Sequence, residues 1–190
     1  MELFKRIQIE LEGLADLMFD RFIDHSSEKR PVEQKLYLNE NSELVIPAEN
    51  IYAFLFSENP AGCAKAFEGK KGKEYIRLGQ GSIFISPSHI LVIHDGKPVR
   101  VKEIIGDQFW VFEAAPRTKQ GSLSIKQEIK PRPVLKLPWS ISFEITIVES
   151  PIITDTKVLN WFNKGGIEIG MGTYRPRFGR FRVSKFEESK

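Results

Sequence analysis

The stretch GGIEIGMGTYRPRFGRFRV, residues 165–183, holds five glycines in its first fifteen residues and four arginines within residues 175–182. Glycine permits positive backbone φ and a close approach of other groups, so such a run either turns the chain tightly or presents amide N–H groups to a ligand. Guanidinium groups match phosphate geometry and stack on bases. The stretch therefore predicts a permissive loop that leads into a basic strand at a polyanion-binding edge.

The strand that ends this stretch is expected to have two unlike faces. A side-chain period of two places Phe181 and Val183 on one face and Arg180, Arg182 and Ser184 on the other. One face would pack and the other would be cationic. A helix that stops at Gly-Gly, a turn and a charged edge strand would give a similar pattern, and this alternative stays open.

Composition bounds the class of protein. At 190 residues, with 41% hydrophobic and 28% charged residues, the chain is expected to form one globular domain, and large-scale disorder is excluded. The formal net charge is only +3, but residues 113–136 hold six basic and two acidic residues, and residues 164–185 hold six and one. Nucleic-acid-binding proteins concentrate positive charge in this way.

Cysteine usage and hydropathy indicate the cellular compartment and the kinds of partner to expect. Cys63 is the only cysteine, which excludes an intrachain disulfide and a cysteine-based zinc site within one chain. The sequence has no run of eighteen apolar residues and begins without an apolar signal core. We expect a cytoplasmic protein with no membrane partner, no metal and no cofactor.

Two segments alternate clearly and predict core strands. In residues 4–11 the inward side chains are Ile7, Ile9 and Leu11, and Trp139–Val148 alternates in the same way. Apolar residues at helical spacing then predict a helix over residues 14–23. A second helix is expected to begin at a Thr154 or Asp155 cap and to end at residues 165–166.

The first expected helix carries carboxylates on one stripe, because Asp16, Asp20 and Asp24 recur every four residues. Three carboxylates can hold Mg²⁺, and one can act in strand cleavage. The alternative is the solvated face of an ordinary helix. His25 lies in the polar loop that follows and is the histidine best placed for chemistry, although no partner for it is visible in the sequence.

The middle of the chain mixes short strands and helices. Strands are expected at 35–38, 43–46, 82–86, 89–94, 99–101 and 109–112, and helices after Pro47 and over 61–67. Residues 114–138 differ: they are basic, hold four prolines and place Gly121 near their middle. This composition predicts an extended hairpin arm, with a plain surface loop as the alternative.

Together these elements predict an α+β fold, a ferredoxin-like sheet of split βαβ type with helices on one face. We expect one domain over residues 1–190. Its core would comprise about 1–25 and 139–190. The long insertion would comprise about 26–138 and include the basic arm.

The segments 7–22, IQIELEGLADLMFDRF, and 165–183, with its glycines before RPRFGRF, together resemble the RAMP superfamily. The pattern is most similar to the backbone subunits of CRISPR effector complexes, proteins of antiviral defence, and to their relatives in phages and mobile elements. The resemblance covers mainly the first 25 and last 50 residues.

The resemblance implies a modified RNA-recognition-motif fold and a protein that polymerises head to tail along single-stranded guide RNA, which it kinks with a hairpin thumb. Residues 114–138 would be that thumb. The positions that match the glycine-rich loop near the nucleic acid are Gly170, Gly172, Tyr174, Arg175 and Arg177. Some relatives cleave RNA with an aspartate after the first strand or with a histidine, roles that only Asp16, Asp20, Asp24 or His25 could inherit here.

The working hypothesis is a non-enzymatic protein that binds single-stranded nucleic acid, RNA before DNA, and forms a homo-oligomer or filament, with a multi-subunit effector complex as one setting. Tyr174 and Phe178 would stack on bases. The cations expected to contact phosphate are Arg175, Arg177, Arg180, Arg182, Lys126, Lys130 and Arg132. The alternatives are an endoribonuclease that uses His25 or an aspartate of the first helix, and a structural or interaction protein of a phage or mobile element.

Overall fold

The computed structural model describes residues 4–21, 31–101, 106–114, 130–148 and 150–189. Its centre is an antiparallel sheet with the strand order β10-β1-β9-β5-β3, in which β4 also pairs with β9 and β6 with β5. The strands are β1 (Phe4–Gly13), β3 (Val45–Pro47), β4 (Ile83–Ser86), β5 (His89–His94), β6 (Lys97–Pro98), β9 (Trp139–Val148) and β10 (Phe181–Glu188).

β4 and β5 lie one after the other along the same side of β9. Ile83 lies opposite Ile147, and His94 lies opposite Trp139, so the two short strands run antiparallel to β9 over most of its length. Since β1 separates β9 from β10, the sheet has the split βαβ arrangement. The α+β, ferredoxin-like fold class expected from the sequence is confirmed.

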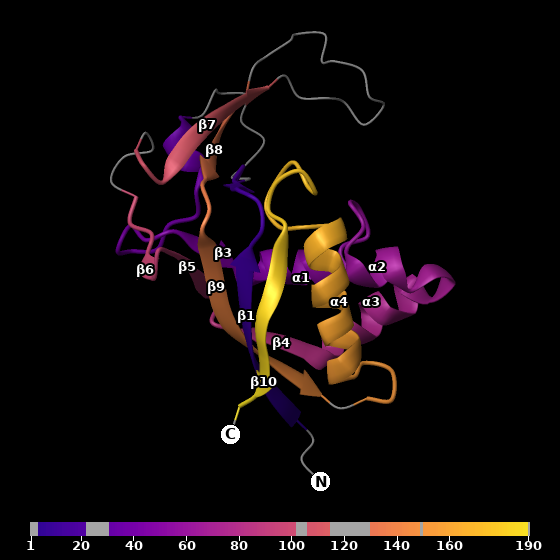
Figure 1. The fold of residues 1–190 in the computed structure, drawn as a ribbon. Helices are drawn as coiled ribbons and strands as arrows, with labels where there is room; N and C mark the ends of the chain where they lie inside the picture. Colours follow the sequence, from indigo (N-terminus) through magenta and orange to yellow (C-terminus); the bar gives the residue numbers. More distant parts are fainter. Residues whose placement is uncertain (1–3, 22–30, 102–105, 115–129, 149, 190) are drawn as a thin grey trace.

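The helices lie on one face of this sheet (Figure 1). They are α1 (Ala48–Phe56), α2 (Cys63–Phe67), α3 (Gly72–Ser82) and α4 (Asp155–Glu168), and two 3-10 turns, η1 (Val32–Lys35) and η2 (Gly69–Lys71), connect other elements. α4 begins as expected, because the Thr154 side chain caps it by accepting a hydrogen bond from the Lys157 amide. No helix of the described residues is long and apolar enough to cross a membrane.

The expected helix over residues 14–23 is wrong for the part that the structure describes. Residues 14–21 form a bend at 14–15 and then the short strand β2 (Leu17–Met18), and none of them is helical. Their amides are taken by distant carbonyls, since Leu14 and Ala15 donate to Arg180 and Phe19 donates to Pro133. Long-range hydrogen bonds thus override the local helical spacing.

The helices between β1 and β4 come instead from residues 48–82. The expected insertion, residues 26–138, therefore contributes α1–α3 and the strands β4 and β5 to the central layers. Residues 35–38 are also not the strand expected: η1 ends at Lys35, and Leu38 forms only an isolated bridge to Leu44.

α4 does not end at Gly165 and Gly166 but continues through them to Glu168. The two glycines are packing positions, because a Cβ at Gly165 would lie 2.5 Å from the Cys63 sulfur and one at Gly166 would lie 2.5 Å from the Phe181 carbonyl oxygen. The helix is terminated after Glu168 by Gly170, whose φ is +73° and whose amide donates to the Gly165 carbonyl.

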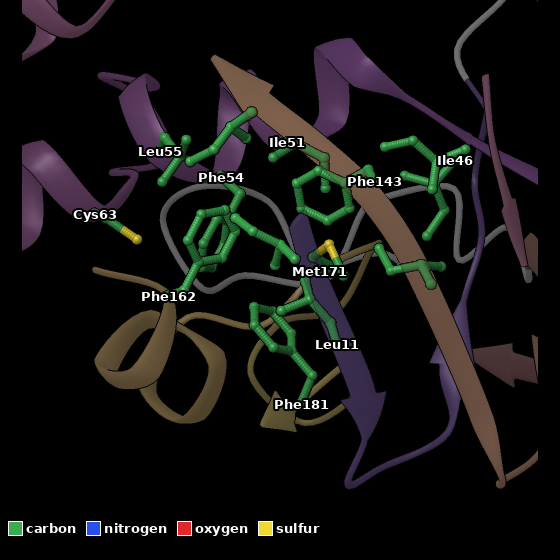
Figure 2. Close-up of a cluster of buried hydrophobic side chains, with 14 of the residues drawn as sticks. Leu11, Ile46, Ile51, Phe54, Leu55, Cys63, Phe143, Phe162, Met171 and Phe181 are labelled. Carbon is green, nitrogen blue, oxygen red and sulfur yellow. The ribbon is translucent and has the colours of Figure 1, made fainter. Parts of the chain in front are cut away.

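Aromatic side chains fill the space between helices and sheet (Figure 2). Phe54 of α1 stacks on Phe162 of α4 with ring centroids 5.6 Å apart, and it lies 5.3 Å from Phe181 of β10. Met171, which follows α4, points into the same cluster and is 2% exposed. The glycine-rich stretch is therefore anchored in the core at its start.

The opposite face of the sheet, here called the open face, is polar along its two central strands. β1 presents Arg6, Gln8, Glu10 and Glu12 there, and the Gln8 side-chain amide donates to the Ser142 hydroxyl of β9. The remaining residues of β9 on this face are Ser140, Glu144, Thr146 and Val148. The exposed rings Phe4 of β1 and Phe84 of β4 lie on this face at the end of the sheet near Val148, and neither β1 nor β9 offers an aromatic ring between Gln8 and Glu12.

Replacing Gly166 by Ala is expected to lower the free energy of unfolding by about 1–3 kcal/mol, because the new methyl group would collide with the Phe181 backbone carbonyl and with the buried Phe181 ring. Gly81→Ala in α3 is the matched control, since no heavy atom lies within 4 Å of its added Cβ. It should be neutral or stabilising by roughly 0.5–1 kcal/mol. Urea unfolding curves decide this, and equal stabilities for the two variants would contradict the packing role of Gly166.

Candidate nucleic-acid interface

A second, small sheet lies at the end of the molecule where α4 leads into β10 (Figure 1). It has the order β2-β8-β7 and consists of β2, β7 (Phe109–Ala114) and β8 (Lys130–Leu135). Ala114 lies opposite Lys130, so β7 and β8 form the two antiparallel sides at the base of the expected arm. Lys126 and the rest of residues 115–129 lie outside the described residues.

Asp16 attaches this small sheet to the chain that leaves β1. Its two carboxylate oxygens accept hydrogen bonds from the Trp110 indole, at 2.9 Å, and from the Leu137 amide, at 3.1 Å. Its backbone carbonyl accepts from the Gly179 amide at 2.8 Å. Asp16 thus joins β7, the segment between β8 and β9, and the glycine-rich stretch, so a carboxylate that the sequence suggested for chemistry has a structural role.

Asp20 is engaged in a similar way. Its carboxylate accepts from the Arg132 guanidinium at 2.8 Å and lies 3.9 Å from the Lys35 ammonium, and both cationic side chains are buried. Lys35 also donates to the Pro131 carbonyl. The expectation that Arg132 contacts phosphate is therefore corrected: at 6% exposure it is an internal anchor of β8.

An aromatic cluster packs between the small sheet and the glycine-rich stretch. It consists of Trp110, Phe112, Tyr174 and Phe178, together with Met18 and Val134. Phe178 is only 6% exposed, so the expectation that it stacks on a base is corrected as well. Tyr174 remains half-buried, with the Arg132 guanidinium 5.4 Å from its ring centroid.

The turn between α4 and β10 needs glycine at specific positions. Gly172 has φ +75°, and a Cβ there would lie 2.4 Å from the Met18 carbonyl oxygen, so this loop rests directly on β2. Thr173 donates its amide to that same carbonyl. Tyr174 also has positive φ, at +58°. The backbone is therefore held in an unusual course by contacts with β2.

Arg175 is a half-buried cation of this turn whose charge is poorly compensated by hydrogen bonds or carboxylates of the protein. Its guanidinium is half-buried, and its one hydrogen bond to a described residue is a long one, 3.4 Å, to the Gly170 carbonyl. Burial lowers the pKa of the guanidinium, and no described carboxylate lies within ion-pair distance of it. A partly desolvated arginine without a carboxylate favours an external anion.

Arg175 borders a pocket of about 260 Å³. The walls come from β2 and the residues after it, from β3 and α1, and from the glycine-rich turn. They are formed by Leu17, Phe19, Asp20, Tyr37, Ile46, Asn50, Ala53, Met171, Gly172, Thr173 and Arg175. The sequence pointed to Gly172 and Arg175 but gave no sign of Tyr37 or Asn50, because the fold brings them in from distant segments.

The other expected cations differ in availability. Arg177 is exposed and lies over the Phe112 and Phe178 rings, with its guanidinium carbon 5.5 and 5.6 Å from their centroids. Arg180 and Lys130 are exposed and have no ion pair among the described residues. Arg182 is exposed too, but it binds the Glu12 carboxylate at 2.6 Å.

The expected catalytic candidates are not assembled into a site by the described residues. Asp16 and Asp20 hold structural partners, whereas Asp24 and His25 fall outside the described ranges. Within the part of the chain that is described, no three histidine, cysteine or acidic residues gather as metal ligands.

The sequence matches no protein-family model and no curated protein. Among solved structures, the chain is similar to a chain of the cryo-EM structure of the Type III-B Cmr-beta bound to cognate target RNA, with a TM-score of 0.58 and 14% identity. The match covers 98% of this chain and 61% of that one, so the present chain spans about three-fifths of the neighbour's length. At this identity the similarity establishes a shared fold.

Replacing Asp20 by Asn is expected to lower the free energy of unfolding by about 2–3 kcal/mol, because two buried cations lose their carboxylate. Glu12→Gln removes the carboxylate of a pair whose Arg182 side chain is 65% exposed, and should cost about 0–1 kcal/mol. Both values come from thermal or urea unfolding. If the Asp20→Asn and Glu12→Gln variants were equally stable, the structural role of Asp20 as partner of the two buried cations would be contradicted.

Proposed function

We propose that the protein binds single-stranded nucleic acid, RNA in preference to DNA, at the end of the molecule formed by the glycine-rich turn and the base of the β7–β8 arm. The observation that carries this proposal is Arg175, a half-buried guanidinium that borders a pocket and has only one long hydrogen bond within the described residues. A backbone phosphate is an anion that such a group can bind through paired N–H donors.

The surroundings of Arg175 support a strand rather than a lone anion. Arg177, Arg180 and Lys130 add exposed cations near the same turn, which suits a backbone with repeated charges. Tyr174 offers a half-exposed ring beside them. Lys126 stays a prediction, since it lies outside the described residues, and Arg182 is a weaker candidate because Glu12 already binds it.

The open face is the less suitable surface. RNA-recognition sheets stack bases on aromatic rings of their central strands, whereas β1 and β9 present glutamates, serines and other polar groups over most of this face. We therefore place the strand at the turn and the arm, not across the sheet.

The fold similarity supports the finer part of the proposal. The neighbouring chain belongs to an assembly that is bound to target RNA, which agrees with the resemblance to backbone subunits of CRISPR effector complexes. We propose the same general role here, a subunit that coats RNA within a larger complex. The endoribonuclease alternative gains nothing from Asp16 and Asp20, whose carboxylates are occupied by structural partners.

The Arg175→Ala/Arg177→Ala double variant is expected to bind single-stranded RNA at least tenfold more weakly than the unaltered protein. Its log–log salt slope should be smaller by about 1.4, since each lost phosphate contact removes roughly 0.7 from the slope. Fluorescence anisotropy of labelled RNA and DNA across a potassium chloride series measures both quantities and shows which nucleic acid is preferred.

Arg6→Ala/Arg77→Ala is the matched control for this experiment, because it removes the same charge from exposed positions on β1 and α3. It should change affinity little beyond the effect of net charge. Absence of RNA and DNA binding at low salt, or an equal loss in the two double variants, would contradict the proposed site. The first of these results would favour the alternative of a protein-binding surface.

Self-assembly along the strand is proposed from the placement of exposed apolar groups. Phe4 and Phe84, 57% and 53% exposed, lie at one end of the sheet, while Leu14 and Leu137 are exposed at the other. Unlike patches at opposite ends suit a head-to-tail contact, which does not close on itself.

The number of protein copies per RNA should therefore rise in steps with strand length in sedimentation velocity experiments. Phe4→Ser/Phe84→Ser should reduce occupancy of long strands and leave binding to the shortest strand unchanged. One copy on every strand, regardless of length, would contradict self-assembly.

A further inference from the structure

We infer that the pocket bordered by Arg175 takes one nucleobase of the bound strand, and that the Asn50 side-chain amide recognises the polar edge of that base. This inference rests on the proposed function and specifies which part of the ligand the pocket holds. It makes the protein selective among bases, which phosphate contacts alone do not do.

The shape and lining of the pocket suit a flat aromatic ligand with a polar rim. Leu17, Ile46 and Met171 provide apolar wall, and Asn50, Thr173 and Arg175 provide polar groups. The volume of about 260 Å³ is just below the roughly 300–1,000 Å³ of sites that hold whole small molecules, so it suits a single base.

Asn50 is the polar group best placed to discriminate between bases. It lies in the first turn of α1, is half-exposed, and its side chain makes no hydrogen bond to any described residue. Asp20, which also lines the pocket, is instead bound by Arg132. A side-chain amide both donates and accepts hydrogen bonds. Because its N–H and C=O groups lie in one plane, they can pair with the edge of a base.

Two residues that line the pocket beside Asn50 suit the flat face of the base and the adjacent phosphate. The Tyr37 ring lines the pocket, with the Arg21 guanidinium carbon 5.5 Å from its centroid, and an aromatic wall can stack on a base. Arg175 lines the same pocket and can bind the phosphate next to that base. The exposed rings of the open face, Phe4 and Phe84, lie at one end of the sheet, whereas this pocket combines an aromatic ring with hydrogen-bonding groups, so a base can leave water here.

The test is anisotropy with four labelled RNA homopolymers, of A, U, C and G, using the intact chain. The unaltered protein should prefer one homopolymer over the weakest by roughly fivefold or more. Asn50→Ala should reduce this preference to less than about twofold and leave the salt slope unchanged, because the phosphate contacts remain. Asn163→Ala, at an exposed position of α4, is the matched control and should keep the preference.

A second variant fills the pocket without removing a polar group. Ala53 lines the pocket from α1 and is exposed, so Ala53→Leu should keep the fold, remove the base preference and retain salt-dependent binding. Equal affinity of the unaltered protein for all four homopolymers, or a preference that survives both variants, would overturn the base pocket. If Arg175→Ala/Arg177→Ala still weakens binding in that case, the pocket inference fails while the proposed function stands.

Discussion

The two sheets and the glycine-rich turn are held in one arrangement by the short segment that leaves β1. Asp16 is its central residue, because its two carboxylate oxygens and its backbone carbonyl accept hydrogen bonds from Trp110, Leu137 and Gly179. Hydrogen bonds to a charged acceptor are stronger than neutral ones, so the carboxylate holds Trp110 of the small sheet firmly. The backbone carbonyl of the same residue holds the turn at Gly179, so Asp16 links the turn to the small sheet.

At this end of the molecule, some cationic side chains are paired with carboxylates of the protein, and others are left to bind a ligand. Arg132 and Lys35 are buried on Asp20, and Arg182 is paired with Glu12, so these cations stabilise the fold. Arg175 and Arg177 follow a turn whose backbone rests on β2, and neither has a carboxylate partner among the described residues. The protein thus offers guanidinium groups on a rigid support, which lowers the entropy cost of binding an extended polyanion.

The sequence predicted the strands with strong alternation and also several shorter elements, namely β4, β5, β7, α1 and α2. β1, β9 and the Phe181 face of β10 follow directly from period-two patterns, and the Thr154 cap marks the start of α4. The helix expected at residues 14–23 failed because the partners of those amides, Arg180 and Pro133, lie more than a hundred residues away in sequence.

The candidate site was predictable only in part, for the same physical reason. Local composition pointed to Arg175, Arg177 and the glycines, since their chemistry is unusual in any context. The burial of Arg132 and Phe178 depends on what packs against them, and no short-range pattern contains that information. Asn50 enters the pocket only because α1 lies beside the turn, and this proximity exists only in the folded chain.

Photo-cross-linking can locate the bound strand on the surface of the protein. Single-stranded RNA containing 4-thiouridine would be cross-linked to the protein, and the modified peptides would be mapped by mass spectrometry. We expect cross-links in residues 170–180 and at the base of the β7–β8 arm, and few on β1 or β9. Cross-links concentrated on the open face, with none in residues 170–180, would contradict this placement of the strand.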